Sequence, residues 1–81
     1  MFGFGAYRPK YNGAEVRETE VRDLACGQAI WLEDDSGNDV RRVVASITYN
    51  PKRQLVKLWY EGYLGDDLWG ATATVQREVK K

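Results

Sequence analysis

Two acidic groups come nearest to a chemical site in this sequence. Residues 34–39, DDSGND, offer the oxygen ligands that calcium prefers. They lack the glycine and the distal glutamate at the spacing of a calcium loop, so we interpret them as a solvated hairpin turn. Asp66 and Asp67 are adjacent, and we interpret them as solubilising loop residues rather than an acid/base pair. The sequence therefore predicts no metal site and no cofactor.

The usual nucleophile and base pairs are absent. The chain has no histidine, and Cys26 is its single cysteine. This excludes Ser-His-Asp and Cys-His catalysis, an intramolecular disulfide and a cysteine zinc site. We interpret Cys26 as a small buried hydrophobe rather than a reactive thiol. Enzymatic activity stays uncertain but is not favoured, since a site would need Asp, Glu, Lys or Tyr at an interface between copies.

Side chains suited to binding are concentrated in one glycine-rich segment. Residues 60–70, YEGYLGDDLWG, carry three aromatics, two leucines and three glycines. The glycines disfavour both helix and strand, so we expect a loop. It could cap the core or bind a partner. In a mixture of the two, Leu64 and Leu68 would point inward, and Tyr63 and Trp69 partly outward.

The remainder of the chain has the pattern of a small β domain. Residues 1–13 are rich in aromatics and glycine and predict an extended arm before a single domain at 14–81. Residues 14–25 fit a strand or a helix, and we favour a strand. We expect further strands at 27–33, 40–49, 54–60 and 71–79, joined by turns at 34–39 and 50–53.

The turns predict how three of these strands pair. If Asn50 faces Arg53, Ile47 faces Val56, and a second turn would place Ile30 beside Val43. The predicted inner face is then Ile30, Leu32, Val43, Ala45, Ile47, Val56, Leu58 and Tyr60.

The opposite face of this predicted sheet is unusually apolar. Arg42 would lie between Trp31 and Glu61, next to an apolar strip of Trp31, Val44, Leu55 and Trp59. Such a strip requires a cover. Two covers remain open: a partner or second copy, or the aromatic residues of the arm, which are Phe2, Phe4, Tyr7 and Tyr11.

The pattern resembles that of SH3-like and Tudor-like barrels. The resemblance covers about residues 21–79 and rests on DLACGQAIWLE, on the hairpin from RRVVASITY to QLVKLWYEG, and on ATVQREV. We therefore expect a mainly β fold, either a small antiparallel barrel or a strongly bent sheet of four or five strands. The alternative is an α+β fold with a helix near 14–25. The resemblance implies binding of peptides, modified side chains or nucleic acid through loop aromatics.

These features favour a non-catalytic protein- or peptide-binding or assembly module. The partner would be the chain itself, in a homo-oligomer such as a dimer, or another protein. A nucleic-acid-binding barrel is an alternative, although the formal net charge is zero. A small-molecule binder or enzyme at an oligomer interface is another. The candidate binding residues are Trp31, Arg42, Trp59, Tyr60, Tyr63 and Trp69.

The sequence also bears on location. A single cysteine needs no oxidising compartment, so we expect a cytoplasmic protein. No basic segment with a following apolar run succeeds Met1, and no apolar stretch approaches the ~20 residues of a membrane span. We therefore predict no signal peptide and no membrane association.

Overall fold

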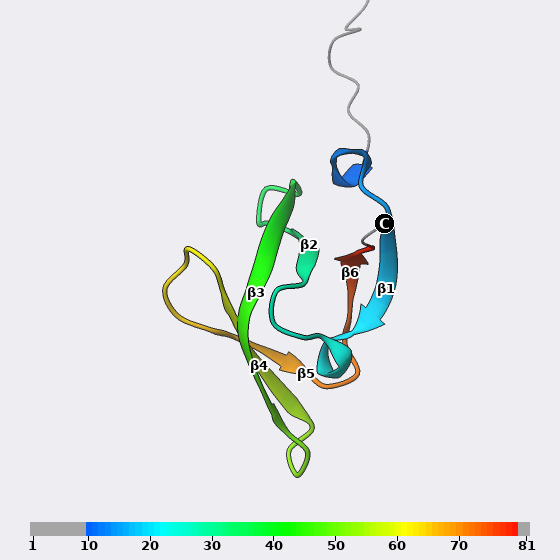
Figure 1. Ribbon diagram of the computed structural model, residues 1–81. Coiled ribbons are helices and arrows are strands. Elements are labelled where there is room, and N and C mark those ends of the chain that lie inside the picture. Colours follow the sequence, from blue (N-terminus) through cyan, green and yellow to red (C-terminus); the bar gives the residue numbers. More distant parts are fainter. Residues whose placement is uncertain (1–9, 80–81) are drawn as a thin grey trace, which may run out of the picture.

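The computed structural model describes residues 10–79 and shows one antiparallel sheet of six strands (Figure 1). The strands are β1 (Val16–Glu20), β2 (Ala29–Glu33), β3 (Asp39–Asn50), β4 (Leu55–Tyr60), β5 (Asp67–Gly70) and β6 (Thr74–Glu78). Two short 3₁₀ turns, η2 (Lys10–Gly13) and η3 (Val21–Asp23), complete the fold. Within this range there is no α-helix, and hence none long and apolar enough to cross a membrane.

The sheet order is β1-β6-β2-β3-β4-β5, and the sheet does not close into a barrel. The mainly β prediction is confirmed, with more strands than the four or five expected. Residues 14–25 form β1 and η3, so the strand prediction there is confirmed and the helical alternative is wrong. The predicted arm falls mostly on residues 1–9, which lie outside the described residues, and residues 10–13 form the η2 turn.

Short polar side chains fix both long hairpins. Asp34 Oδ1 accepts hydrogen bonds from the backbone N–H groups of Ser36 (2.9 Å) and Asn38 (2.8 Å). Asn50 Oδ1 accepts from the N–H groups of Lys52 (3.1 Å) and Arg53 (3.3 Å). Such side chains replace a backbone acceptor and so favour a turn. The acidic residues 34–39 therefore stabilise a hairpin.

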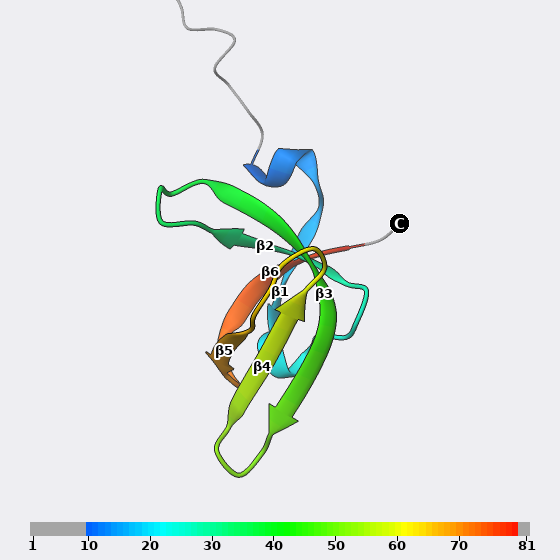
Figure 2. The ribbon, with the colours of Figure 1, turned by 90° about the vertical axis from the view of Figure 1, so that its left-hand side faces the viewer.

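The strand β3 serves both halves of the sheet because it contains a β-bulge. Its first part pairs with β2 and its second part with β4, and the register shifts between Val44 and Ser46. Ala45 is the extra residue and is exposed, whereas Val44 is fully buried. A bulge bends and twists its strand. Figures 1 and 2 show β3 curving from the β2 hairpin at one end to the β4 hairpin at the other.

The core lies between the two halves. Its buried members are Val21, Leu24, Ile30, Val44, Val56, Leu58, Tyr60, Ala71 and Val75. The turn η3 brings Val21 and Leu24 to one end of this core, where the Val21 N–H donates to the Ala73 carbonyl at 2.8 Å. The Ala71 N–H donates to the Gln54 carbonyl at 2.8 Å, which connects the β3–β4 turn to the same end.

The register of the β3–β4 hairpin differs from the prediction by two positions. Ile47 lies opposite Leu58, and Tyr49 lies opposite Val56. The turn is longer than expected, because residues 51–54 all belong to it and Gln54 takes a positive φ of 54°. A shift by an even number of residues leaves each side chain on its predicted face. Val56, Leu58 and Tyr60 are therefore buried as expected.

The predicted register of β2 with β3 is wrong by one position, and the contacts across the sheet therefore differ from those predicted. Ile30 lies opposite Arg42, and Trp31 lies opposite Arg41, so Arg42 does not separate Trp31 from Glu61. The turn between β2 and β3 is one residue shorter than predicted, since Glu33 pairs with Asp39 rather than with Val40.

The predicted apolar strip does not form. Val44 faces the core, and Val43 and Ala45 do not belong to the core cluster, because the bulge reverses the alternation of β3. Trp31 and Trp59 do lie on the side away from Ile30 and Leu58, as strand alternation requires. They pair with different parts of β3, at Arg41 and at Ser46, and so do not share a surface.

Two further expectations need correction. Residues 67–70 form strand β5, paired with β4, although the glycines of the 60–70 segment disfavour a strand in isolation. Cys26 is exposed rather than buried, because it stands in the turn before β2.

The different burial of two leucines predicts that their substitution by alanine lowers the free energy of unfolding by very different amounts. Leu58 is fully buried, whereas Leu68 on the neighbouring strand is 61% exposed. We expect Leu58→Ala to lower the free energy of unfolding by about 2–4 kcal/mol, because it leaves a cavity. Leu68→Ala should change it by less than about 0.5 kcal/mol. Urea unfolding in dilute solution measures both, and equal losses would contradict this assignment of the core.

Candidate interaction surface

Three of the large exposed apolar residues lie close together in the sequence. Tyr63 is 53% exposed, Leu64 104% and Leu68 61%, and all three lie within six positions of the sequence. Tyr49, at 39%, is the remaining large hydrophobic residue that is exposed in the described chain. We call Tyr63, Leu64 and Leu68 the apolar tip.

The backbone of the loop at residues 61–66 explains why the tip is exposed. Gly62 and Gly65 adopt φ angles of 79° and 85°, which side chains with a Cβ rarely take. These two turns lead the chain from the end of β4 out and back to β5, and the loop projects to one side of the sheet (Figure 1). Leu64 lies between the two glycines and meets solvent on all sides.

The expectation that Leu64 and Leu68 point inward is therefore wrong. Trp69 points inward instead and packs against the core cluster, and it lies opposite Val56 in the β4–β5 pair. Alternation along β5 then places Leu68 on the outer face. The plug for the core is Trp69, and the leucines remain available on the surface.

A part-buried hydrogen bond secures the base of this loop. The Tyr60 hydroxyl donates to Asp67 Oδ2 at 2.8 Å, and so joins the last residue of β4 to the first of β5. Burial and, after it, the bond to Asp67 together raise the pKa of Tyr60 to about 12. The Trp69 indole N–H opposes this rise slightly, although it makes no hydrogen bond of good geometry among the described residues. The neutral phenol is therefore the form that the fold holds.

A cation–π contact positions the aromatic member of the tip. The Arg42 guanidinium carbon lies 4.0 Å from the centroid of the Tyr63 ring. Arg42 also donates to the Arg41 carbonyl at 3.0 Å. A contact of this kind contributes about 0.5–1 kcal/mol at an exposed site. It holds one side of the Tyr63 ring against Arg42 of β3.

Acidic side chains surround the tip. Glu61, Asp66 and Asp67 are all exposed and flank it in the sequence. The ion pairs found in residues 10–79, Arg22–Glu20 and Arg41–Glu78, involve none of them. The surface is thus an apolar projection with a negative rim.

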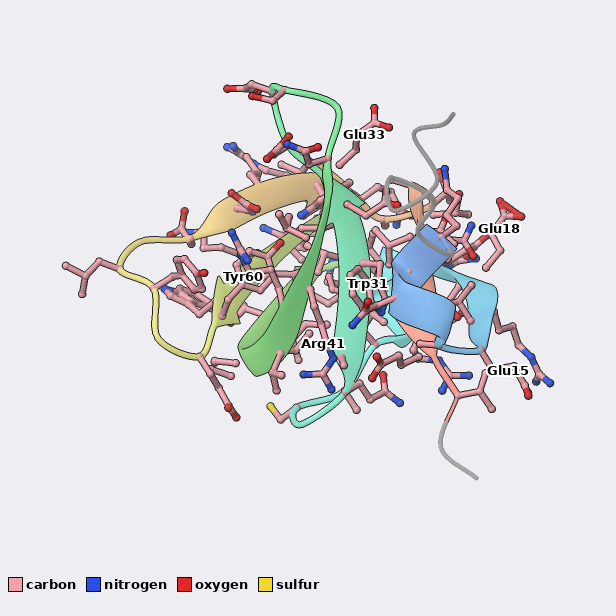
Figure 3. The ribbon with its side chains drawn as sticks, turned by 90° about the horizontal axis from the view of Figure 1, so that it is seen from above. Glu15, Glu18, Trp31, Glu33, Arg41 and Tyr60 are labelled. Carbon is pink, nitrogen blue, oxygen red and sulfur yellow. The ribbon has the colours of Figure 1, made fainter. Side chains whose placement is uncertain are left out.

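Trp31 belongs to a separate, largely closed cluster. Its indole N–H donates to Glu78 Oε1 at 3.1 Å, and Arg41 donates to both carboxylate oxygens of Glu78, at 3.0 and 2.9 Å. Arg41 and, less strongly, Trp31 thereby hold the pKa of Glu78 below its usual value. The Tyr11 ring covers Trp31 at 5.9 Å between centroids, and Figure 3 shows Trp31 beside the η2 turn.

This cluster fastens the η2 turn to the sheet. Tyr11, one of the aromatics expected to cover Trp31, does so, whereas Phe2, Phe4 and Tyr7 lie outside the described residues. An open groove of about 730 Å³ lies beside it. The groove is lined by Lys10, Tyr11, Asn12, Trp31, Gly37, Asn38 and Asp39. Because the polar atoms of Trp31 and Glu78 already have partners, we assign the cluster a structural role.

The structure thus brings together some of the candidate binding residues and separates others. Arg42 contacts Tyr63, and Tyr60 and Trp69 lie beneath the loop at its base, where Tyr60 is only 8% exposed. Trp59 lies partly exposed on the outer face, with Lys57 Nζ 6.0 Å from its ring centroid.

Sequence reasoning did not include Leu64 among the binding residues. The available signal was its place between a tyrosine and a glycine in GYLG, since a leucine flanked in this way by turn residues has few neighbours to cover it.

The candidate surface, within the described residues, contains no evident metal site. In the part of the chain that is described, no group of three His, Cys, Asp or Glu residues could hold a metal ion.

A scan of protein-family models, a search of curated proteins and a search of solved structures each found no match to the chain. Its function therefore has to be argued from its own surface.

The raised pKa of Tyr60 predicts that the fold loses stability in alkali. The pKa of Tyr60 is about 12 in the folded chain, against a reference of 10.0. Between these values the unfolded chain releases the proton first, so the free energy of unfolding falls as the pH rises. The stabilisation is complete below pH 10 and is lost as the pH rises through about 12.

Tyr60→Phe isolates this effect from other groups that titrate in alkali. We expect the variant to be less stable than the parent at pH 8 and to lose less stability between pH 8 and pH 11.5, by urea unfolding. Parallel losses in both proteins would show that Tyr60 does not titrate late in the folded chain.

Proposed function

We propose that this chain is a non-catalytic protein-binding or assembly module that contacts its partner through the apolar tip. The carrying observation is that Tyr63, Leu64 and Leu68 are each more than half exposed and lie within six positions of the sequence. Clustered exposed apolar residues mark interaction sites, and a few central anchors supply most of the binding energy at such sites. Leu64 has the geometry of such an anchor.

The charges at the tip favour a protein over a nucleic acid. Glu61, Asp66 and Asp67 would repel a phosphate backbone, and the Arg42 guanidinium is already stacked on Tyr63. The formal net charge of zero points the same way.

The raised pKa of Tyr60 favours binding over catalysis. Tyr60 is buried and donates a hydrogen bond to Asp67 at the base of the tip, and the raised pKa of Tyr60 makes its phenolate less accessible near neutral pH. This pair therefore suits an anchor for the loop better than a catalytic base.

We also propose that the open sheet is a variant of the SH3-like and Tudor-like barrels. The successive hairpins from β2 to β4 and the return of β6 to a place beside β1 support this kinship. The binding role of those barrels is then a supporting analogy only, because one fold hosts many functions.

Photo-cross-linking tests the proposed function. A photoreactive amino acid in place of Leu64 should cross-link to one protein in the cell of origin, and the same residue at Ser36 should not. Ser36 is a suitable control because it is exposed in the β2–β3 turn, distant in sequence from the tip.

Binding of the purified partner should then weaken at least about tenfold with Leu64→Asn, as expected for removal of a central anchor. Ser36→Asn should leave the affinity unchanged. Equal cross-linking from both positions, or unchanged affinity with Leu64→Asn, would rule out the apolar tip as the binding site.

A further inference from the structure

A second surface of the chain complements the apolar tip. A groove of about 300 Å³ runs over the outer face of β3, β4 and β5. It is lined by Thr48, Asn50, Arg53, Leu55, Lys57 and Leu68. Leu55 and Leu68 supply the apolar part of its lining.

The rim of this groove is positive. Arg53 stands in the β3–β4 turn and Lys57 in the middle of β4, and both are exposed. Across residues 10–79 neither forms an ion pair with an acidic side chain, since the pairs present use Arg22 and Arg41. The groove thus offers an apolar floor with unpaired cations, whereas the tip offers an apolar leucine with Glu61 and Asp66.

We infer that the partner of the apolar tip is a second copy of this chain, whose groove receives Leu64 while Arg53 and Lys57 pair with Glu61 and Asp66. The inference rests on the proposed function, because it names the occupant of the same tip. Opposite charges on two patches of one chain fit self-association.

Reciprocal contact gives a closed dimer. Leu68 belongs both to the tip and to the groove, so the two patches adjoin on β5. Two copies related by a two-fold axis can therefore fill both grooves at once, with the two Leu68 side chains near the axis. Such symmetric dimers are the commonest oligomers and leave no patch free for further growth.

A charge exchange tests this pairing. The tip variant carries Glu61→Lys and Asp66→Lys, and the groove variant carries Arg53→Glu and Lys57→Glu. Asp67 is left unchanged because it accepts the Tyr60 hydrogen bond. All four altered side chains are exposed, so unchanged circular dichroism and melting in dilute solution confirm that each variant folds.

Sedimentation equilibrium at rising concentration gives the outcome. The parent should approach twice the 9.3 kDa mass of one chain. Each variant alone should stay near 9.3 kDa, because the tip of one copy and the groove of the other then carry charges of the same sign. An equal mixture of the two should regain the dimer mass, since each tip then meets a groove of opposite charge.

Three results would overturn the inference. These are a parent that stays monomeric at millimolar concentration, a variant that dimerises alone as well as the parent does, and a mixture that remains monomeric. A monomeric parent whose Leu64 position still cross-links to a different protein would leave the proposed function intact and remove only the second copy as its partner.

Discussion

The bulge at Ala45 is the constraint on which the remainder of the sheet depends. One extra residue bends β3, so that its first part can pair with β2 and its second part with β4. Without the extra residue, strict alternation could not place Val44 and Ile47 on the same side of one strand. With it, both parts of β3 turn an apolar side toward the same core, and a chain of 81 residues encloses that core with a single sheet.

The bulge also leads to the candidate site through a short series of contacts. Val44 lies opposite Tyr60 at the point where the register shifts, and Tyr60 is therefore drawn into the core at the end of β4. From there its hydroxyl reaches Asp67 and fixes the two ends of the loop that carries the apolar tip. A loop with its two ends joined samples fewer conformations, so the core restricts the loop that carries the apolar tip.

The strands of the β2–β4 meander could be predicted because their alternation is strong and their turns carry Asn, Asp and Pro. Their register could not, because an Asx turn tolerates different lengths and Gln54 gives no signal of its positive φ. The bulge was equally hidden, since Val43 and Val44 are adjacent and either could face the core.

The direction of the loop side chains depends on tertiary pairing. The strand β5 exists because β4 offers it an edge, and Trp69 points inward because it lies opposite Val56. Local sequence contains neither fact. The presence of a loop after β4 was therefore within reach of sequence reasoning, whereas the exposure of Leu64 and Leu68 was not.

The place of β6 within the sheet governs when the fold can be completed. β6 stands between β1 and β2, and it is the one strand with which β1 pairs. During synthesis β1 emerges early but must wait for residues 74–78, while the hairpins from β2 to β4 can form as they appear. Closing so long a stretch of chain slows folding relative to local pairing. Charged side chains on an edge strand disfavour pairing with other chains, so we expect the charged residues of β1, in VRETE, to limit aggregation of the segment until β6 has been made.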